Sequence, residues 1–212
     1  MTGLTGMLDD TAVRRKFRIP NDAETIYTDG ACPRNGMVDG RAGIGVFFGS
    51  GDERNISARL PGHHQTNQRA ELFAILKALE TLHTQRTSTK RHVFILTDSD
   101  YAVKALTVWA VKWEQGAWKN TQGKDVVSKD LFKRARDMLR LLAHTGTVVE
   151  LRHVAGHAGI VGNEMADQLA VAGALMEEVI DVGWDEEPFE DVDPEEVEEM
   201  MARLERGEDT MI

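Results

Sequence analysis

Hydrophobic and polar residues follow two different periods along the chain, and the period changes near residue 67. Before that point, β-branched and aromatic runs are separated by glycine-rich turns, which is typical of an antiparallel meander. These runs predict strands at residues 24–29, 42–49 and 54–60, and two later runs predict strands at residues 92–97 and 147–153. The run "VFILT" is apolar on both faces, so we expect a central strand covered by helices on each side.

Helical periodicity is clearest after residue 67. There, apolar side chains recur at the spacing i, i+3, i+4 and i+7, at Leu72, Ile75, Leu76 and Leu79. Similar patterns predict helices over residues 99–114, 125–143 and 161–178. Strands followed by helices that alternate with strands are typical of a mixed sheet with helices packed on it, so we predict an α/β fold.

The length of 212 residues, 42% of them hydrophobic, suffices for one well-buried domain of about 150 residues and is short for two. We expect a disordered leader over residues 1–21, one domain over residues 22–178, and an acidic tail over residues 179–212. The tail is expected to be disordered or to form a short amphipathic helix. No stretch of about 18 apolar residues occurs, so we expect no membrane segment.

The single cysteine, Cys32, excludes an internal disulfide framework and favours a reducing, intracellular location. It does not distinguish the cytoplasm, the nucleus and the mitochondrion. We expect the protein to be a monomer.

The net charge of −10 is unevenly distributed along the chain. Residues 176–212 hold 16 of the 35 acids and 2 of the 25 bases, which leaves 19 acids against 23 bases in residues 1–175. The body is therefore mildly basic, and an anionic partner such as a nucleic acid is electrostatically possible. The acidic tail is either a solvated segment, which we favour, or a contact for a partner protein or for the basic body.

Four acidic residues have both a structural and a functional interpretation. Asp29 ends the first strand in "YTDGACPRNG" and Asp98 ends the central strand in "VFILTDSD", where ligands of open α/β sheets gather. Each of the two could equally cap the segment that follows it. Glu71 lies in the first turn of a predicted helix, where the macrodipole favours an acid. Asp167, in "GHAGIVGNEMADQLA", would ordinarily be an exposed helical acid.

Together, the four acids suggest a metal centre. Carboxylates gathered from separate elements would repel one another and raise each other's pKa unless a cation lay among them. Oxygen ligands select hard ions such as Mg²⁺, with Mn²⁺ as a possible substitute. Two such ions about 4 Å apart would activate a water molecule and stabilise the leaving oxygen in phosphodiester cleavage. Spacing alone does not establish that the four acids converge.

Five segments, in this order and at these separations, resemble the type 1 ribonuclease H family: "YTDGACPRNG", "HHQTNQRAE", "ILTDSDY", "WKNTQGKDV" and "GHAGIVGNEMAD". The resemblance covers about residues 22–175. It implies a five-stranded mixed sheet, with a meander of three antiparallel strands plus two parallel strands and helices on both faces. It also implies Mg²⁺-dependent, endonucleolytic hydrolysis of the RNA strand of RNA/DNA hybrids, which leaves a 5′-phosphate and a 3′-hydroxyl.

The resemblance assigns catalytic roles to five residues. Asp29 would be shared by two Mg²⁺ ions, and Glu71, Asp98 and Asp167 would complete the ligand set. His157, in "GHAG", would be a mobile histidine that assists proton transfer and product release. A loop histidine that titrates without a role is the alternative.

For the RNA strand, the resemblance implies contacts from Cys32, Asn35, Asn67 and Gln68. The 2′-hydroxyl, both donor and acceptor, is the feature that such groups would recognise. A plainer interpretation is that Asn67 caps a helix and that Asn35 belongs to a turn. Both interpretations can hold at once.

For the DNA strand, the resemblance implies a basic protrusion whose channel is lined by Tyr101, Trp109, Trp113 and Thr121. Tryptophans at i and i+4 are more often core residues, so we expect at least one tryptophan of this segment to be mainly packed. A phosphate pocket would involve Thr66, with His64 and Ser128 at positions where animal members have an arginine and an asparagine. These two departures predict an affinity for the RNA/DNA hybrid that is weaker or more dependent on pH.

A second functional class is a module that binds hybrid or single-stranded nucleic acid without turnover. Four clustered carboxylates have no use in such a module, so the acid set argues against it. Binding without cleavage in the presence of Mg²⁺ or Mn²⁺ would favour it.

Overall fold

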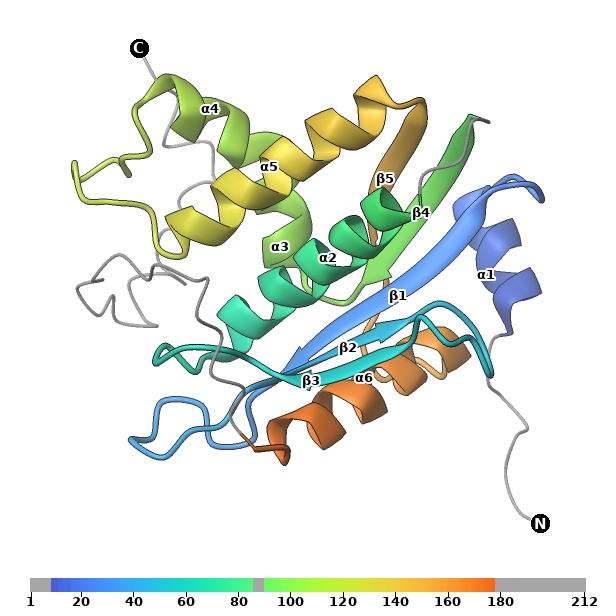
Figure 1. Cartoon of the computed structure of the whole chain (residues 1–212), viewed down its shortest axis with the longest axis horizontal. Coiled ribbons are helices and arrows are strands. Elements are labelled where there is room, and N and C mark those ends of the chain that lie inside the picture. The colour runs from blue at the N-terminus through green and yellow to red at the C-terminus, as the bar shows by residue number, and fades with distance from the viewer. Residues whose placement is uncertain (1–8, 86–89, 178–212) are drawn as a thin grey trace.

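A computed structural model describes residues 9–85 and 90–177 (Figure 1). The expectations for the acidic tail and for the first residues of the leader lie outside these ranges. The sheet contains β1 (Glu24–Ala31), β2 (Gly43–Phe47), β3 (Ile56–Arg59), β4 (Arg91–Thr97) and β5 (Thr147–His153). Its order is β3-β2-β1-β4-β5. The pairs β1–β2 and β2–β3 are antiparallel, whereas β4 pairs in parallel with β1 and with β5, which confirms the expected five-stranded mixed sheet.

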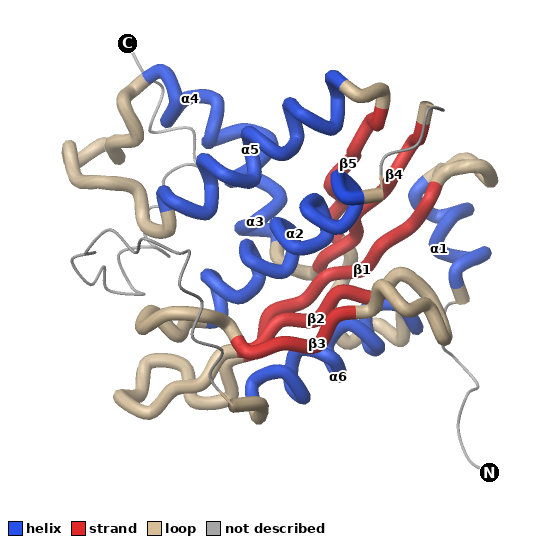
Figure 2. Tube along the Cα trace, in the orientation of Figure 1, coloured by secondary structure: helices blue, strands red, loops and turns tan. Residues whose placement is uncertain are grey.

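Helices cover both faces of this sheet (Figure 2). Helix α2 (Asn67–Thr84) and helix α5 (Lys129–His144) lie on one face, and α6 (Val161–Ala174) lies on the other. Along β4, Val93 and Ile95 belong to the core under α2 and α5. Phe94 and Leu96 belong to the core under α6. Successive side chains of β4 thus point to opposite faces of the sheet, and each face is covered by its own apolar core.

The segment predicted as one helix over residues 99–114 is helical from Asp100 onward. It consists of α3 (Asp100–Lys104), a π-helical turn η1 (Ala105–Trp109) and α4 (Ala110–Gln115). Helix α5 begins later than expected because Ser128, just before it, has a left-handed φ of 56°. The helical path is unbroken from Asp100 to Gln115, so the predicted helix is confirmed, with a π-helical turn in its middle. This helical segment and the loop that follows it up to Ser128 are called the tryptophan-containing lobe.

The expected disorder of the leader is wrong for residues 10–17, which form helix α1 (Asp10–Phe17). Asp9 caps this helix by accepting from the backbone nitrogen of Ala12, and Val13 is fully buried. Arg14 donates to the carbonyl oxygens of Pro20 and Ala23, both over 2.9 Å. An eight-residue helix is marginal alone, so packing of Val13 and the Arg14 contacts stabilise it.

No helix in the described ranges combines the length and apolar character needed to cross a bilayer.

Candidate metal centre

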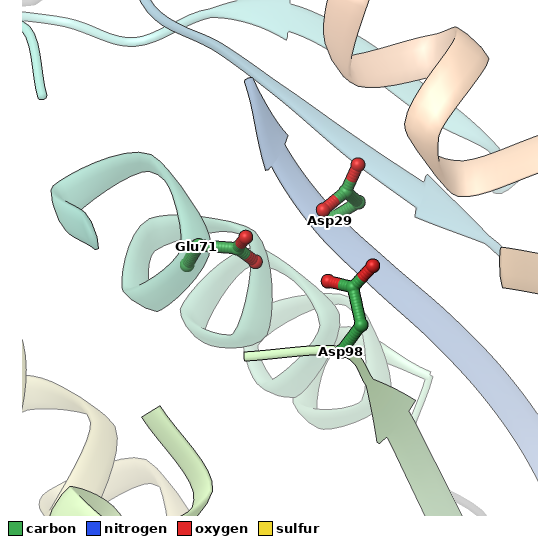
Figure 3. A group of neighbouring side chains, drawn as sticks. All are labelled: Asp29, Glu71 and Asp98. Atoms are coloured by element: carbon green, nitrogen blue, oxygen red, sulfur yellow. The ribbon is translucent and has the colours of Figure 1, made fainter. Parts of the chain in front are cut away.

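Three carboxylates from three separate elements face one another at one end of the sheet (Figure 3). Asp29 lies near the end of β1, Asp98 follows β4, and Glu71 lies on the second turn of α2. One oxygen of each side chain lies within 4.8 Å of the others. The parallel pairing of β1 with β4 sets Thr28 beside Thr97, which explains why the next residues, Asp29 and Asp98, lie side by side toward the carboxyl ends of two central strands.

Glycine at position 30 lets Glu71 join the two strand-end acids. A β-carbon on Gly30 would lie 2.2 Å from the backbone nitrogen of Glu71, closer than any side chain permits. The backbone of α2 therefore packs directly against β1 beside Asp29. The sequence Asp-Gly in "YTDGA" thus places an acid on the strand and leaves room for the helix that carries the second acid.

Burial and mutual repulsion raise the pKa values of the two buried acids. Asp29 is 5% exposed, and desolvation followed by the negative charges of Asp98 and Asp167 raises its pKa to about 7. Glu71 is 6% exposed, and its pKa is raised well above the ordinary value by desolvation and then by Asp29 and Asp98. A cation bound among them would lower both pKa values, because it favours the charged carboxylates.

Asp167 stands apart from this group. It lies on α6, is partly buried, and contributes its charge to the field at Asp29. A β-carbon on Gly45, the β2 residue paired with Asp29, would lie 2.0 Å from the carbonyl oxygen of Ala166. This close approach brings α6 and Asp167 toward Asp29, although the carboxylate of Asp167 is not one of the three that converge within 4.8 Å.

The residues fit a divalent cation. All three converging groups are carboxylates, the ligand type preferred by hard ions. The Oε2 atom of Glu71 is buried and has no hydrogen-bond partner among the described residues. A buried anionic oxygen without a partner is unfavourable unless a cation or a proton satisfies it.

A model of the RNase H family matches residues 21–175, which include the whole sheet and all four acids. The chain belongs to the RNase H family. The matched range begins just before β1 and ends just after α6, so it coincides with the described sheet and the helices from α2 onward.

Relatives with the same family name come from distant organisms. The chain is 39% identical over 165 residues to Ribonuclease H1 of Homo sapiens, covering 78% of this chain and 54% of the relative. It is 39% identical over 149 residues to Ribonuclease H of Paracidovorax citrulli, covering 70% of this chain and 91% of the relative. This chain thus spans about half the length of the human relative and almost all of the bacterial one.

Solved structures of RNase H proteins share the fold. LC9-RNase H1, a type 1 RNase H with the type 2 active-site motif, is 30% identical with a TM-score of 0.56, and the match covers 74% of each chain. A foamy viral protease-reverse transcriptase in complex with RNA/DNA hybrid is 25% identical with a TM-score of 0.58. That match covers 72% of this chain and 20% of the viral chain.

Three of the four predicted RNA-strand residues of this RNase H chain are joined by hydrogen bonds. The side chain of Asn67 accepts from the backbone nitrogen of Cys32 over 3.0 Å. The backbone nitrogen of Asn67 donates to the side chain of Asn35 over 3.1 Å. Gln68 is exposed on the first turn of α2, and the cap of this helix is Thr66 rather than Asn67. Asn67 therefore ties the loop after β1 to the start of α2, as a structural residue would.

The predicted DNA-strand residues differ in exposure. Trp109 is only 6% exposed, and its ring centroid lies 5.8 Å from that of Tyr101 and 6.0 Å from that of Trp113. Trp113 is partly buried and packs edge-on against Phe132. Thr121 is exposed on the loop between α4 and α5. Packing therefore accounts for Trp109, whereas Thr121 and part of Trp113 face solvent.

The residues expected at a phosphate pocket lie at two helix starts. Thr66 accepts from the backbone nitrogen of Arg69 and so caps α2. Ser128 is 7% exposed and its side chain makes no capping bond to α5. His64 is partly buried in the loop before α2.

His157 is exposed in the loop between β5 and α6, and its backbone has a left-handed φ of 49°. The histidine is not part of the three-carboxylate group. Its neighbour Gly156, however, lies directly against Asp98, since a β-carbon on this glycine would be 2.7 Å from Asp98 Oδ2. The loop that carries His157 is thus adjacent to the three-carboxylate group.

Sequence reasoning missed two residues that touch the site. Asn163 donates through Nδ2 to Asp98 Oδ2 over 3.1 Å, and Gly156 packs against the same oxygen. The available signal was the position of Asn163 four residues before Asp167, which places both on one face of α6.

Proposed function

We propose that this protein is a metal-dependent endoribonuclease that hydrolyses the RNA strand of RNA/DNA hybrids and leaves 5′-phosphate and 3′-hydroxyl ends. The observation that carries the proposal is the convergence of Asp29, Glu71 and Asp98 within 4.8 Å on an RNase H fold. The identity with Ribonuclease H1 of Homo sapiens and Ribonuclease H of Paracidovorax citrulli supports it.

The metal in this proposal is Mg²⁺, as two ions, with Mn²⁺ as a substitute. Asp29, Glu71, Asp98 and Asp167 would hold them. When bound, such ions supply Lewis acidity at the scissile phosphate. The protein holds its acids on two strand ends and two helices, which fixes their positions before the substrate arrives. His157, on the adjacent loop, would accept or donate a proton near the leaving group.

The substrate in this proposal is a hybrid duplex, read as RNA on one side and DNA on the other. Cys32, Asn35, Asn67 and Gln68 would contact the RNA strand, where backbone and amide groups complement the 2′-hydroxyl. The DNA strand would be contacted by Trp113, Thr121 and Tyr101. The packed Trp109 would contribute less to this contact. His64, Thr66 and Ser128 would contact its phosphates. The foamy viral relative in complex with RNA/DNA hybrid supports this substrate class.

A panel of strand-labelled substrates tests the proposed substrate. The protein is incubated with an RNA/DNA hybrid, double-stranded RNA and double-stranded DNA, each with Mg²⁺ and with EDTA. We expect cleavage of the labelled RNA strand of the hybrid in Mg²⁺ and no cleavage in EDTA. Binding of the hybrid without cleavage in Mg²⁺ and in Mn²⁺ would instead favour a non-catalytic module.

The monomeric state, the reducing compartment and the solvated acidic tail rest on sequence alone and stay predictions.

A further inference from the structure

One oxygen of Asp98 is contacted by two residues outside the carboxylate group. Asn163, in the first turn of α6, donates to Asp98 Oδ2 over 3.1 Å. Gly156 approaches the same oxygen so closely that a β-carbon would lie 2.7 Å from it. The Asp98 carboxylate therefore accepts a hydrogen bond from Asn163 and lies close to the backbone of Gly156, and neither residue is a proposed metal ligand.

Asn163 is placed for this contact by the packing of α6 on β1. A β-carbon on Gly162 would lie 2.2 Å from Cε2 of Tyr27, so only glycine allows the first turn of α6 to approach the strand this closely. The next residue, Asn163, is 2% exposed as a result. Asp167 follows one helical turn later on the same face.

The side-chain oxygen of Asn163 does not explain why this residue is buried. Its Oδ1 atom is buried and has no hydrogen-bond partner among the described residues. Burying an unpaired amide oxygen is unfavourable, and an apolar residue of similar size would avoid the cost. Helix α6 begins at Val161 after the N-cap residue Ile160, so Asn163 is not the N-cap of this helix either. The contact that remains is the bond from Nδ2 to Asp98.

We propose that Asn163 is a positioning residue of the metal centre, whose N–H bond holds the Asp98 carboxylate in the orientation that binds the cation. The inference rests on the proposed function, because the orientation of Asp98 matters only if Asp98 is a metal ligand. Groups that orient metal ligands in this way change metal affinity or activity by about 10- to 100-fold when they are replaced.

Asn163→Asp separates this role from a structural one. Aspartate has the same shape as asparagine, and an acid in the first turn of a helix is favoured by the macrodipole. A purely structural Asn163 would lose stability when it is replaced, because it is 2% exposed, but the folded variant would keep its Mg²⁺ affinity and kcat. A positioning Asn163 would lose Mg²⁺ affinity and kcat as well, because Asn163→Asp removes the donor and sets a second carboxylate against Asp98.

The test compares the full chain with Asn163→Asp, Asn163→Ala and Gln168→Ala. Gln168 is an exposed residue of the same helix and serves as the matched control. Mg²⁺ affinity of the metal-free protein is measured by titration calorimetry, and kcat and KM are measured on the hybrid. We expect both Asn163 variants to lose about tenfold or more in Mg²⁺ affinity and in kcat, with KM changed less than about twofold. Gln168→Ala should match the wild type.

Wild-type Mg²⁺ affinity and kcat in Asn163→Asp would overturn the inference and leave the proposed function intact. Absence of Mg²⁺ binding and of cleavage in the wild type would instead overturn the proposed function. If Asn163→Asp does not fold, Asn163→Ala decides, since it removes the donor to Asp98 without adding a charge. An unchanged Mg²⁺ affinity in that variant would then refute the positioning role.

Discussion

Arg69 donates two hydrogen bonds to Asp130, from Nη1 over 3.0 Å and from Nη2 over 2.6 Å. Arg69 is 4% exposed, so this pair is a buried ionic link between the start of α2 and the start of α5. Helix α2 carries Glu71 two residues later, and Phe132 of α5 packs against Trp113 of the tryptophan-containing lobe. The pair thus connects the helix that carries one of the three converging carboxylates to the proposed DNA-binding side.

Loss of one partner of this buried pair should destabilise the protein more than loss of both. We expect Arg69→Ala to lower the free energy of unfolding by about 3 kcal/mol, because the charge of Asp130 is left without its partner. The double variant Arg69→Met with Asp130→Leu should lose less. Urea unfolding of the single and double variants measures both, and a larger loss in the double variant would contradict the argument.

Gly30 should be irreplaceable because of the helix that packs on it. The β-carbon of Gly30→Ala would lie 2.2 Å from the backbone nitrogen of Glu71, so α2 must move away from β1. We expect a loss of stability of about 3 kcal/mol and a lower Mg²⁺ affinity. Gly116→Ala is the control, since its nearest neighbour would be 3.4 Å away. Equal stability of the two variants would show that α2 does not depend on this contact.

The metal-free protein should lose stability as the pH rises from about 4 to about 7. The native pKa of Asp29 is about 7 against an ordinary 3.8, so between these values the native state holds a proton that the unfolded state has released. Asp29→Asn removes the contribution of Asp29 to this dependence, while that of Glu71 stays, and should raise the stability at pH 8 in EDTA by on the order of 2 kcal/mol. Thermal unfolding of both proteins at pH 5 and pH 8 checks the sign. The predicted sign would be contradicted if the wild type were more stable at pH 8 than at pH 5 while Asp29→Asn had the same stability at both.

Replacement of Trp109 should change the stability of the protein, whereas replacement of Thr121 should change KM for the hybrid. Trp109→Ala removes a ring that is 6% exposed, and we expect a loss of stability of about 3 kcal/mol or more. Thr121→Ala changes an exposed loop residue, and we expect unchanged stability with a higher KM for the hybrid. Unfolding curves and steady-state kinetics of both variants distinguish the two roles. A Thr121→Ala protein with unaltered KM would remove this residue from the proposed DNA contact.

The strands and most helices could be predicted because their apolar periods are long and unambiguous. Asp29 and Asp98 could be placed at strand ends, but their convergence with Glu71 depends on the close approach at Gly30, which no local pattern reveals. Helix α1 was missed because tertiary contacts, rather than its eight residues alone, stabilise it. Asn163 was missed because its partner, Asp98, is 65 residues away in the sequence.

The central claim is that the converging carboxylates form a catalytic metal centre. Cleavage of an RNA-labelled hybrid in Mg²⁺ by the wild type, Asp29→Asn and Asp98→Asn tests it most directly, because each variant keeps the shape of the side chain and removes its charge. We expect the wild type to cut the RNA strand, both variants to lose about a thousandfold or more in kcat, and both to bind the hybrid as before. Cleavage by either variant at a rate near that of the wild type would contradict the account.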